Sequence, residues 1–470
     1  MSTGLVEATC PVAAAARAWP DAPAVIWNEG GWNYREFHRR IAGCASRLAA
    51  AGIRPGDRVA LDLPPSAECL ALLVALWRRG AAACLLNRRW PDSSRAEAAE
   101  RIGANAIITP DSLAEWIGDG EDEPTPIDLS LPATILFTSG SSGAPKPAVH
   151  SFGNHHASAH ASNRNIPLAP GDRWLLSLPL YHVGGIGVIF RCWLGGAAVA
   201  LPTPGEDMTD TLRRHTVTHV SLVGTQLHRM LREDRAAKTL IGMRAILLGG
   251  GAIGEGLVRE AEANNLRIHT SYGMTETSSQ IVCTRPGDTS AHLKTSGRPL
   301  TEGTVAISSE GEILVRGQTL FLGYLDGESV IRQSNPEGWF ATGDLGAMDD
   351  DGYLRVTGRR DNLIVSGGEN IQPEEVEAAL ANIEGVAEAM VVPVAEEEFG
   401  QRPVAFVRMD EDAPSIPDER LRAELARTLP RFKIPVTFHP WPEDSAQPGF
   451  KPSRAEFAKR AGDIGCASAD

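Results

Sequence analysis

Apolar runs of strand length alternate with amphipathic stretches of helix length in the middle of the chain. The apolar runs are Val217–Gly224, Met243–Gly250 and Leu266–Tyr272, and the amphipathic stretches between them are Thr225–Glu233 and Gly254–Asn265. These periods predict strands in the first case and helices in the second. Strands that alternate with helices form crossover units, so we predict an α/β fold with a parallel sheet covered by helices on both faces.

Two polar, glycine-containing segments follow these expected strands. Gly249–Ile253 comes after the second strand, and Gly273–Gln280 comes after the third. Ligands of parallel sheets bind beyond the carboxyl ends of the strands. We therefore expect both segments to line one crevice.

A second α/β pattern begins near Glu374 and suggests a separate small domain. Its expected elements are a helix over Glu374–Asn382, strands over Val386–Val394 and Arg402–Met409, and a helix over Asp418–Leu429. About a hundred residues is a common size for a small domain. Charge and glycine cluster in Gly358–Gly368, which predicts a large domain over residues 1–360 and a small, mobile one over residues 361–470.

Composition and charge narrow the class of protein. The chain has 470 residues, 43% of them hydrophobic, and a formal net charge of −14. Such a length suits two or three globular domains. The negative charge disfavours binding to nucleic acid or to an anionic membrane, which needs clustered basic residues, although a local basic pocket could still bind a small anion.

Cysteine usage and hydropathy predict a cytoplasmic protein. The seven cysteines are scattered without a CxxC pair, which favours a reduced intracellular environment over a disulfide framework or a zinc site. The apolar run Cys69–Trp77 ends at Arg78 and is too short to span a bilayer. Glu7 and the lack of a basic, then apolar, leader give no sign of a signal peptide.

The stretch TSGSSGAPKP, Thr138–Pro147, directly follows the apolar run Ala133–Phe137. It is not a Walker A loop, because Gly140 and Gly143 are three apart and Lys146 is followed by proline. Small hydroxyl side chains, free N–H groups and one cation suit an oligophosphate. A flexible surface loop is an equally good interpretation of this stretch alone.

Three further stretches are ambiguous when each is taken by itself. SYGMTET, Ser271–Thr277, could supply a stacking ring, a phosphate hydrogen bond and a Mg²⁺ ligand, or only a helix cap. WFATGDLG, Trp339–Gly346, and GRRDNLIVSGGENIQPEEVE, Gly358–Glu377, could equally be turns, which Gly-Asp pairs favour.

Taken together and in order, these stretches resemble the adenylate-forming superfamily of acyl-CoA synthetases, peptide-synthetase adenylation domains and luciferases. The resemblance runs from about residue 20 to residue 457. It rests on TSGSSGAPKP, SLPLYHVGG, LLGGGAI, SYGMTETSSQ, SGRPL, GEILVRG, GYL, WFATGDLG, GRRDNLIVSGGENIQPEEVE and GFKPSR. It implies a large domain of layered sheets and helices with a mobile C-terminal domain, and an enzyme that uses ATP, Mg²⁺ and coenzyme A.

The resemblance also implies roles for individual residues. Thr138, Ser139, Gly140, Ser141, Ser142, Gly143 and Lys146 would hold the β- and γ-phosphates of ATP. Tyr272, Gly249, Gly250 and Gly251 would line the adenine site, Asp344 and Arg359 would bind the ribose region, Thr275 would contact the α-phosphate, and Glu276 would bind Mg²⁺. Lys451 would bridge the substrate carboxylate and the α-phosphate, and Asp361 would be the hinge of the small domain.

Two departures from the superfamily pattern affect these assignments. Pro147 stands where a glycine usually follows the phosphate-loop lysine, and Phe450 stands directly before Lys451 in place of glycine. Proline fixes φ and removes an N–H, so we expect a stiffer exit from the phosphate loop.

Within the superfamily, the chain is most similar to the o-succinylbenzoate–CoA ligases of menaquinone synthesis. The similarity rests on Ser177–Leu201, THVSLVGTQLHRML, SYGMTETSSQIV and HLKTSGRPL. It implies a pocket with donors for a second carboxylate, for which His182, Ser278 and Gln280 are the main candidates and Arg191 and Ser279 are further ones. We expect His182 to line or gate the pocket.

Other specificities and assemblies stay open from the sequence. An aryl- or medium-chain acyl-CoA ligase, or an enzyme that loads a carrier protein, would share the same motifs. We expect small-molecule partners only, namely a carboxylic acid, ATP and CoA, and a homodimer or higher homo-oligomer is compatible with the sequence.

Overall fold

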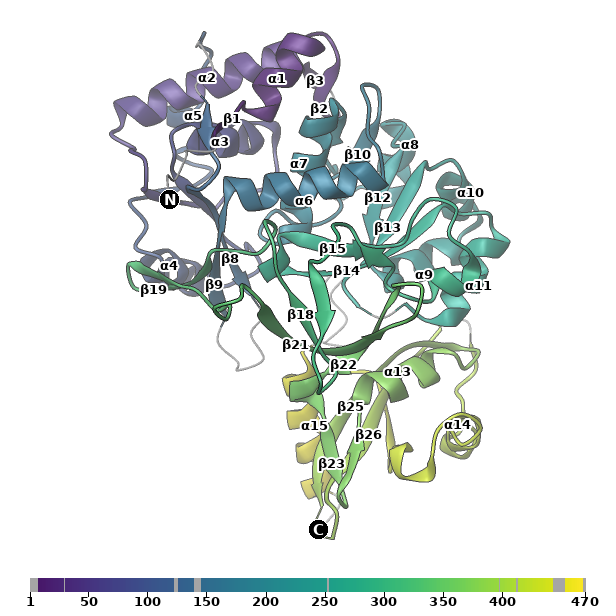
Figure 1. Ribbon diagram of the computed structural model, residues 1–470. Coiled ribbons are helices and arrows are strands. Elements are labelled where there is room, and N and C mark those ends of the chain that lie inside the picture. The colour runs from purple at the N-terminus through teal and green to yellow at the C-terminus, as the bar shows by residue number, and fades with distance from the viewer. Residues whose placement is uncertain are drawn as a thin grey trace.

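The computed structural model describes residues 7–28, 30–121, 126–138, 145–251, 253–396, 398–410, 413–442 and 453–467. Figure 1 shows a large body of sheets and helices and, below it, a small domain formed by the C-terminal part of the chain. This arrangement confirms the predicted α/β class with a large and a small domain. The predicted boundary at residue 360 stays a prediction.

The first large sheet has nine strands and contains the predicted crossover units. Its order is β16 (Arg298–Pro299), β15 (Ser279–Cys283), β14 (Ile268–Met274), β13 (Ala245–Leu248), β12 (His219–Leu222), β10 (Arg173–Leu175), β11 (Ala198–Ala200), β2 (Pro23–Trp27) and β3 (Gly30–Asn33). The strands from β14 to β2 are parallel, and those at both edges are antiparallel. The carboxyl ends of β13 and β14 therefore lie at one edge, as predicted.

Two more sheets complete the large body. A seven-stranded sheet has the order β20 (Ser329–Ile331), β19 (Gly323–Asp326), β9 (Lys146–Ser151), β8 (Pro132–Thr138), β5 (Ala82–Leu85), β4 (Arg58–Leu61) and β6 (Ala106–Ile108). A four-stranded sheet has the order β17 (Val305–Ile307), β18 (Glu312–Val315), β21 (Phe340–Met348) and β22 (Leu354–Arg359). The short strands β1 (Glu7–Ala8) and β7 (Ile127–Asp128) pair with each other.

The helices of the large body cover the sheets. They are α1 (Pro11–Ala18), α2 (Tyr34–Ala50), α3 (Ala67–Arg78), α4 (Asp92–Arg101), α5 (Leu113–Trp116), α6 (Phe152–Asn165), α7 (Val183–Gly195), α8 (Met208–Arg214), α9 (Gly224–Arg232), α10 (Asp234–Ile241), α11 (Glu255–Ala263) and α12 (Ser290–Leu293). Helix α3 holds the longest apolar run and is buried on nearly all sides, as expected of a helix that is apolar all round. No helix of the described ranges is both long and apolar enough to cross a membrane.

Side-chain caps set where several helices begin. The Asn33 side chain accepts from the Glu36 N–H, and the Glu36 carboxylate accepts from the Asn33 N–H at the start of α2. Ser151 and Asn154 form the same reciprocal pair at the start of α6. Each cap satisfies backbone donors that the first helical turn leaves without partners.

The small domain packs its own sheet between helices. Its elements are β23 (Ile364–Ser366), β24 (Glu369–Ile371), α13 (Pro373–Ala381), β25 (Val386–Glu396), β26 (Gly400–Met409), α14 (Asp418–Leu425), β27 (Phe438–Pro440) and α15 (Arg454–Ala467). Strand β26 lies between β23 and β25 and also pairs with β27. Figure 1 places β22 at the junction of the two domains and β23 within the small one.

Candidate active site

Glu276 lies where the first two large sheets meet. Strand β14 ends in the 3₁₀ turn Thr275–Thr277, which buries the Glu276 side chain to 6% exposure. The hydroxyl of Tyr324 on β19 donates to Oε1 of Glu276, and the Phe321 N–H donates to the Glu276 carbonyl over 2.8 Å. The other oxygen, Oε2, has no partner among the described residues. An anchored carboxylate with one open oxygen fits a Mg²⁺ ligand.

The two ends of the expected phosphate loop lie beside this carboxylate. Thr138 ends β8, Lys146 begins β9, and the two residues are paired in the sheet register. The Nζ of Lys146 is 5.5 Å from the centre of the Tyr324 ring, so one tyrosine touches both the anionic and the cationic group. Ser139, Gly140, Ser141, Ser142 and Gly143 lie outside the described residues.

Three polar side chains form a second cluster next to the same strand. The hydroxyl of Tyr272 on β14 donates to Oδ2 of Asp344 over 2.7 Å, and Nη1 of Arg359 on β22 donates to Oδ1 over 3.0 Å. Burial, and secondly the charge of Asp344, raises the pKa of Tyr272 well above its usual value. Tyr272 is therefore a neutral donor at all physiological pH values, and the structure brings together three residues that the sequence assigned to the nucleotide.

The glycine turn after β13 borders the same crevice. Gly250 has a φ of +85°, a conformation that glycine adopts without strain. A Cβ at Gly249 would lie 3.1 Å from Oγ of Ser271, and that hydroxyl donates to the Leu248 carbonyl. The turn is thus packed tightly against β14 at Gly249, whereas a Cβ at Gly251 would meet nothing within 4 Å.

A buried histidine that received no role from the sequence supports Thr275. The Nε2 of His150 on β9 is 2.7 Å from the Thr275 carbonyl, and burial lowers the pKa of His150 to about 4. The ring is therefore neutral and donates its Nε2–H to that carbonyl. The only sequence signal for this contact is the position of His150 on the strand that follows the phosphate loop, because His150 belongs to none of the motifs described above.

The residues expected to bind the acid fall into a buried and an exposed group. Ser278 and Gln280 are buried, and Nε2 of Gln280 donates to Oγ of Ser162 over 2.7 Å. His182 precedes α7 and is exposed, with its ring 4.6 Å from that of Tyr181. Although His182 reaches the surface, partial loss of hydration of its ring and, secondly, the charge of Arg89 lower its pKa.

Arg191 is a buried cation behind the strand that follows Glu276. Its side chain is 1% exposed, donates from Nη2 to Oγ of Ser279 over 3.0 Å, and lies 5.2 Å from the Trp174 ring centre. No carboxylate of the described chain lies within ion-pair distance of it. A Cβ at Gly187 would lie 2.9 Å from the same Nη2, so the glycine makes room for the guanidinium. The sequence left it open whether this side chain faces solvent.

The small domain supplies the remaining candidates. Asp361 lies exposed in the 3₁₀ turn Arg360–Asn362, directly after β22. Nε2 of Gln372 donates to the Arg359 carbonyl over 3.0 Å, and His228 on α9 is 2.8 Å from the Asp410 carboxylate. These contacts link the large domain to parts of the small domain that follow the expected hinge at Asp361. Lys451 lies outside the described residues.

Sequence profiles of two families match the chain. The profile described as AMP-binding enzyme matches residues 12–124 and 112–325, and the profile described as AMP-binding enzyme C-terminal domain matches residues 375–446. Together they cover both domains of the structure.

Curated relatives are similar over nearly their whole length. The 2-succinylbenzoate–CoA ligase of Bacillus licheniformis is 34% identical over 450 residues, covering 89% of this chain and 93% of the relative. That of Bacillus subtilis is 32% identical over 451 residues, covering 90% and 92%.

Solved structures of such enzymes superimpose closely. A variant of E. coli MenE with bound OSB-AMS has a TM-score of 0.84 at 32% identity and covers 97% of this chain and 98% of its own. The B. subtilis o-succinylbenzoate CoA synthetase in complex with the acyl-adenylate intermediate OSB-AMP has a TM-score of 0.82 at 31% identity, with coverages of 93% and 95%. The same enzyme with ATP and a magnesium ion has a TM-score of 0.81 at 30% identity, covering 93% and 96%.

Proposed function

The chain belongs to the AMP-binding enzyme family, and on that premise we propose that it is an ATP-dependent 2-succinylbenzoate–CoA ligase. The enzyme adenylates the succinyl carboxylate of 2-succinylbenzoate and then transfers the acyl group to coenzyme A. The relatives at 32–34% identity carry this activity in their names. Within this chain, the observation that supports this substrate is the burial of Arg191 away from any described carboxylate.

Arg191 offers what a second carboxylate needs. Burying a guanidinium without a counter-ion costs several kcal/mol, yet no described carboxylate compensates it. Burial lowers the pKa of Arg191 to about 10, so the group is still charged at neutral pH. The substrate has two carboxylates and only one is activated. The spare ring carboxylate would pair with Arg191. The Arg191 side chain also donates to Ser279, the first residue of β15, which is the strand that follows Glu276.

The first half-reaction joins two anions, so the protein must supply positive potential and position. The succinyl carboxylate oxygen attacks the α-phosphorus, the bond from that phosphorus to the bridging oxygen of the β-phosphate breaks, and pyrophosphate leaves with the electron pair. Thr138, Lys146 and the loop between them would hold the leaving pyrophosphate. Bound through the open oxygen of Glu276, Mg²⁺ would neutralise phosphate charge.

The nucleoside would be held by the second cluster. Tyr272 and the glycine turn Gly249–Gly251 would flank the adenine, and Asp344 would accept from the ribose hydroxyls. A carboxylate has about four lone-pair sites, and the bonds from Tyr272 and Arg359 fix the orientation in which Asp344 would meet the sugar. Thr275, whose carbonyl is held by His150, would contact the α-phosphate.

The second half-reaction needs a different arrangement of the small domain. The sulfur of coenzyme A attacks the acyl carbonyl, AMP leaves with the acyl–oxygen electron pair, and the thiol proton goes to solvent. Lys451 would stabilise the first transition state and then withdraw as the small domain turns at Asp361. The exposed position of Asp361 after β22 supports a hinge there. We also place the enzyme in the cytoplasm, where ATP and coenzyme A are available.

A matched pair of acids tests the role of Arg191. 4-Oxo-4-phenylbutanoate is 2-succinylbenzoate without the ring carboxylate, and a site built to bind a polar group rejects the analogue that lacks it. We expect kcat/KM to be about 100-fold higher for 2-succinylbenzoate. Arg191→Met should remove this preference while leaving turnover of the analogue within about threefold.

Arg164→Met, on the exposed face of α6, is the control and should keep the preference. The proposal fails if Arg191→Met lowers both acids equally, or if wild-type enzyme turns over benzoates or fatty acids far faster than 2-succinylbenzoate.

A further inference from the structure

A cleft lies at the end of the nine-stranded sheet that is opposite to the active site. It has a volume of about 550 Å³ and is lined by the first residues of β12, β13 and β14 and by the loop after β15. Tyr272 lies near the other end of β14, and Glu276 follows that end. The parallel order of these strands therefore separates the cleft from the active site by the length of a strand.

Two imidazoles form the floor of the cleft. His219 is 2% exposed and His269 is 5% exposed, and both line the cavity. The Nδ1 of His269 donates to the Thr284 carbonyl over 3.2 Å, and the Nδ1 of His219 lies 2.8 Å from Oγ1 of Thr218. Neither Nε2 has a partner among the described residues. Burial lowers the pKa of both rings, that of His219 to about 4. Because Nδ1 of His269 donates its proton to a carbonyl, Nε2 of His269 presents a lone pair that accepts a hydrogen bond, whereas the tautomer of His219 depends on the direction of its bond with Thr218.

Arginines form the rim. Arg244 is paired with the buried Asp172 over 2.6 Å, and Arg267 donates to the Met243 carbonyl over 3.2 Å. The side chain of Arg285 makes no hydrogen bond or ion pair with the described residues. The Asp288 carboxylate also lines the cleft. The three arginines outnumber it, so the rim carries an excess of positive charge although the chain has a net charge of −14.

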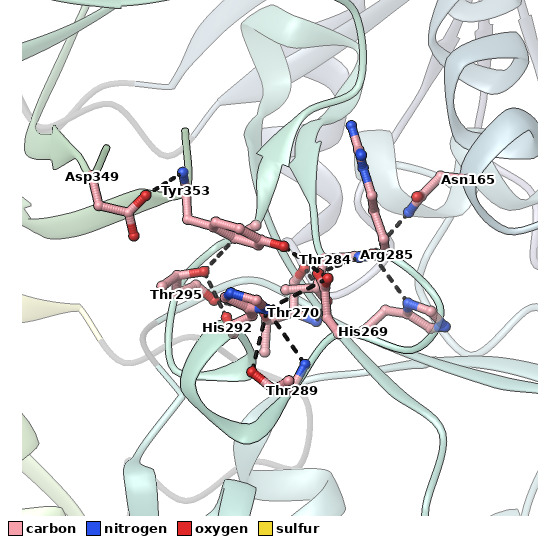
Figure 2. Close-up of polar contacts among 12 residues, drawn as sticks. Asn165, His269, Thr270, Thr284, Arg285, Thr289, His292, Thr295, Asp349 and Tyr353 are labelled. Carbon is pink, nitrogen blue, oxygen red and sulfur yellow. Dashed lines mark hydrogen bonds and ion pairs between the residues drawn. The ribbon is translucent and has the colours of Figure 1, made fainter. Parts of the chain in front are cut away.

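The loop that holds Arg285 is braced, so the cleft is formed before any ligand arrives. Figure 2 shows Asn165 and His269 converging on the Thr284 carbonyl, at distances of 2.9 Å and 3.2 Å. The Asp288 carboxylate accepts from the Arg285 N–H over 2.7 Å and from the Tyr353 hydroxyl over 2.8 Å. A site that is already ordered spends little binding energy on ordering itself.

We propose that this cleft is a second binding site, for a small hydroxylated aromatic acid. The carboxylate would pair with Arg267 and Arg285, whose planar forks match its geometry. The hydroxyl would donate to an Nε2 of the floor. The apolar side chains of Leu266, Ile268 and Leu293, which line the same cavity, would cover the ring. A fully deprotonated anion such as sulfate would pair with the arginines of the rim but has no O–H group to donate to the imidazole on the floor.

Isothermal titration of the full-length enzyme with 3-hydroxybenzoate tests the site. About ten heavy atoms allow a dissociation constant of about 1 mM or tighter. The double variant Arg267→Ala/Arg285→Ala should weaken binding at least tenfold, because it removes two charge-assisted bonds. Benzoate, which lacks the hydroxyl, should bind about fivefold more weakly than 3-hydroxybenzoate.

Two control variants locate the bound acid. Arg35→Ala removes an exposed arginine that pairs with Asp21 and should leave binding unchanged. Arg191→Met alters the proposed acid pocket of the active site and should also leave it unchanged, so the outcome does not depend on the proposed function. Equal affinity in the double variant, loss of binding in Arg191→Met, or no binding of 3-hydroxybenzoate would overturn the proposal.

Discussion

Glu276 and Asp344 are two buried carboxylates of one crevice, and each accepts a hydrogen bond from a tyrosine, yet their surroundings differ. Both oxygens of Asp344 have protein partners, namely Tyr272 and Arg359. Glu276 is held at Oε1 by Tyr324 and has an open oxygen at Oε2. The first arrangement neutralises a charge and fixes an acceptor in place, whereas the second keeps a charge available.

This difference matches the ligand proposed for each group. Ribose hydroxyls are neutral donors, and an acceptor already balanced by Arg359 can take their hydrogen bonds without an excess of negative charge. A divalent cation needs an uncompensated carboxylate oxygen. Mg²⁺ is commonly bound through one or two carboxylates together with substrate phosphates.

Glu276→Gln should have the largest effect, because it removes the charge on which the metal depends. We expect the rate of 2-succinylbenzoate-dependent ATP–pyrophosphate exchange to fall by about 1,000-fold. The amide can still accept from Tyr324, so the thermal unfolding midpoint should stay close to that of the wild type. An exchange rate within tenfold of wild type at saturating Mg²⁺ would show that Glu276 is not the metal ligand.

Asp344→Asn should have a smaller effect, confined to the nucleotide. The amide keeps one acceptor oxygen and loses the charge paired with Arg359, so kcat/KM for ATP should fall by about 100-fold. The apparent Mg²⁺ requirement should be unchanged. If the Mg²⁺ dependence of the exchange rate shifted in this variant as it does in Glu276→Gln, the two carboxylates would not have the different roles proposed for them.

Tyr324→Phe should have the smallest effect of the three. It deletes the hydroxyl that orients Glu276 and keeps the ring beneath Lys146, so we expect about a tenfold rise in the Mg²⁺ concentration needed for half-maximal exchange. Rates should recover at high Mg²⁺, which a merely structural defect would not allow.

Tyr353→Phe is the matched control for this variant, because the Tyr353 hydroxyl also donates to a carboxylate, that of Asp288, but at the opposite end of the sheet. It should leave the Mg²⁺ dependence unchanged. A tyrosine-to-phenylalanine change that acts equally at both positions would refute the positioning role of Tyr324.

The sequence predicted the middle of the large domain well because its strands are short, apolar and bounded by glycine. The predicted strand, helix, strand, helix and strand correspond to β12, α9, β13, α11 and β14. Four elements of the small domain, α13, β25, β26 and α14, were also predicted, whereas β23, β24, β27 and α15 were not. The seven- and four-stranded sheets were not predicted, since their strands pair across long sequence separations, as β19 does with β9, and periodicity carries no information on partners.

The site was predicted where its chemistry is contiguous in sequence and missed where the fold creates it. Tyr272 and Glu276 lie within one motif, whereas Tyr324 reaches Glu276 from 48 residues away. The role of His150 and the burial of Arg191 were missed for a related reason. Whether a histidine is neutral, or an arginine has no counter-ion, depends on burial and neighbours that only the packed structure defines.

The products formed from ATP, coenzyme A and 2-succinylbenzoate test the proposed activity most directly. Mass spectrometry of a reaction run to completion by the full-length enzyme with Mg²⁺ should detect AMP, pyrophosphate and 2-succinylbenzoyl-CoA in equal amounts. Omission of coenzyme A should leave the acyl-adenylate. Formation of ADP and phosphate, or turnover of other acids with none of 2-succinylbenzoate, would contradict it.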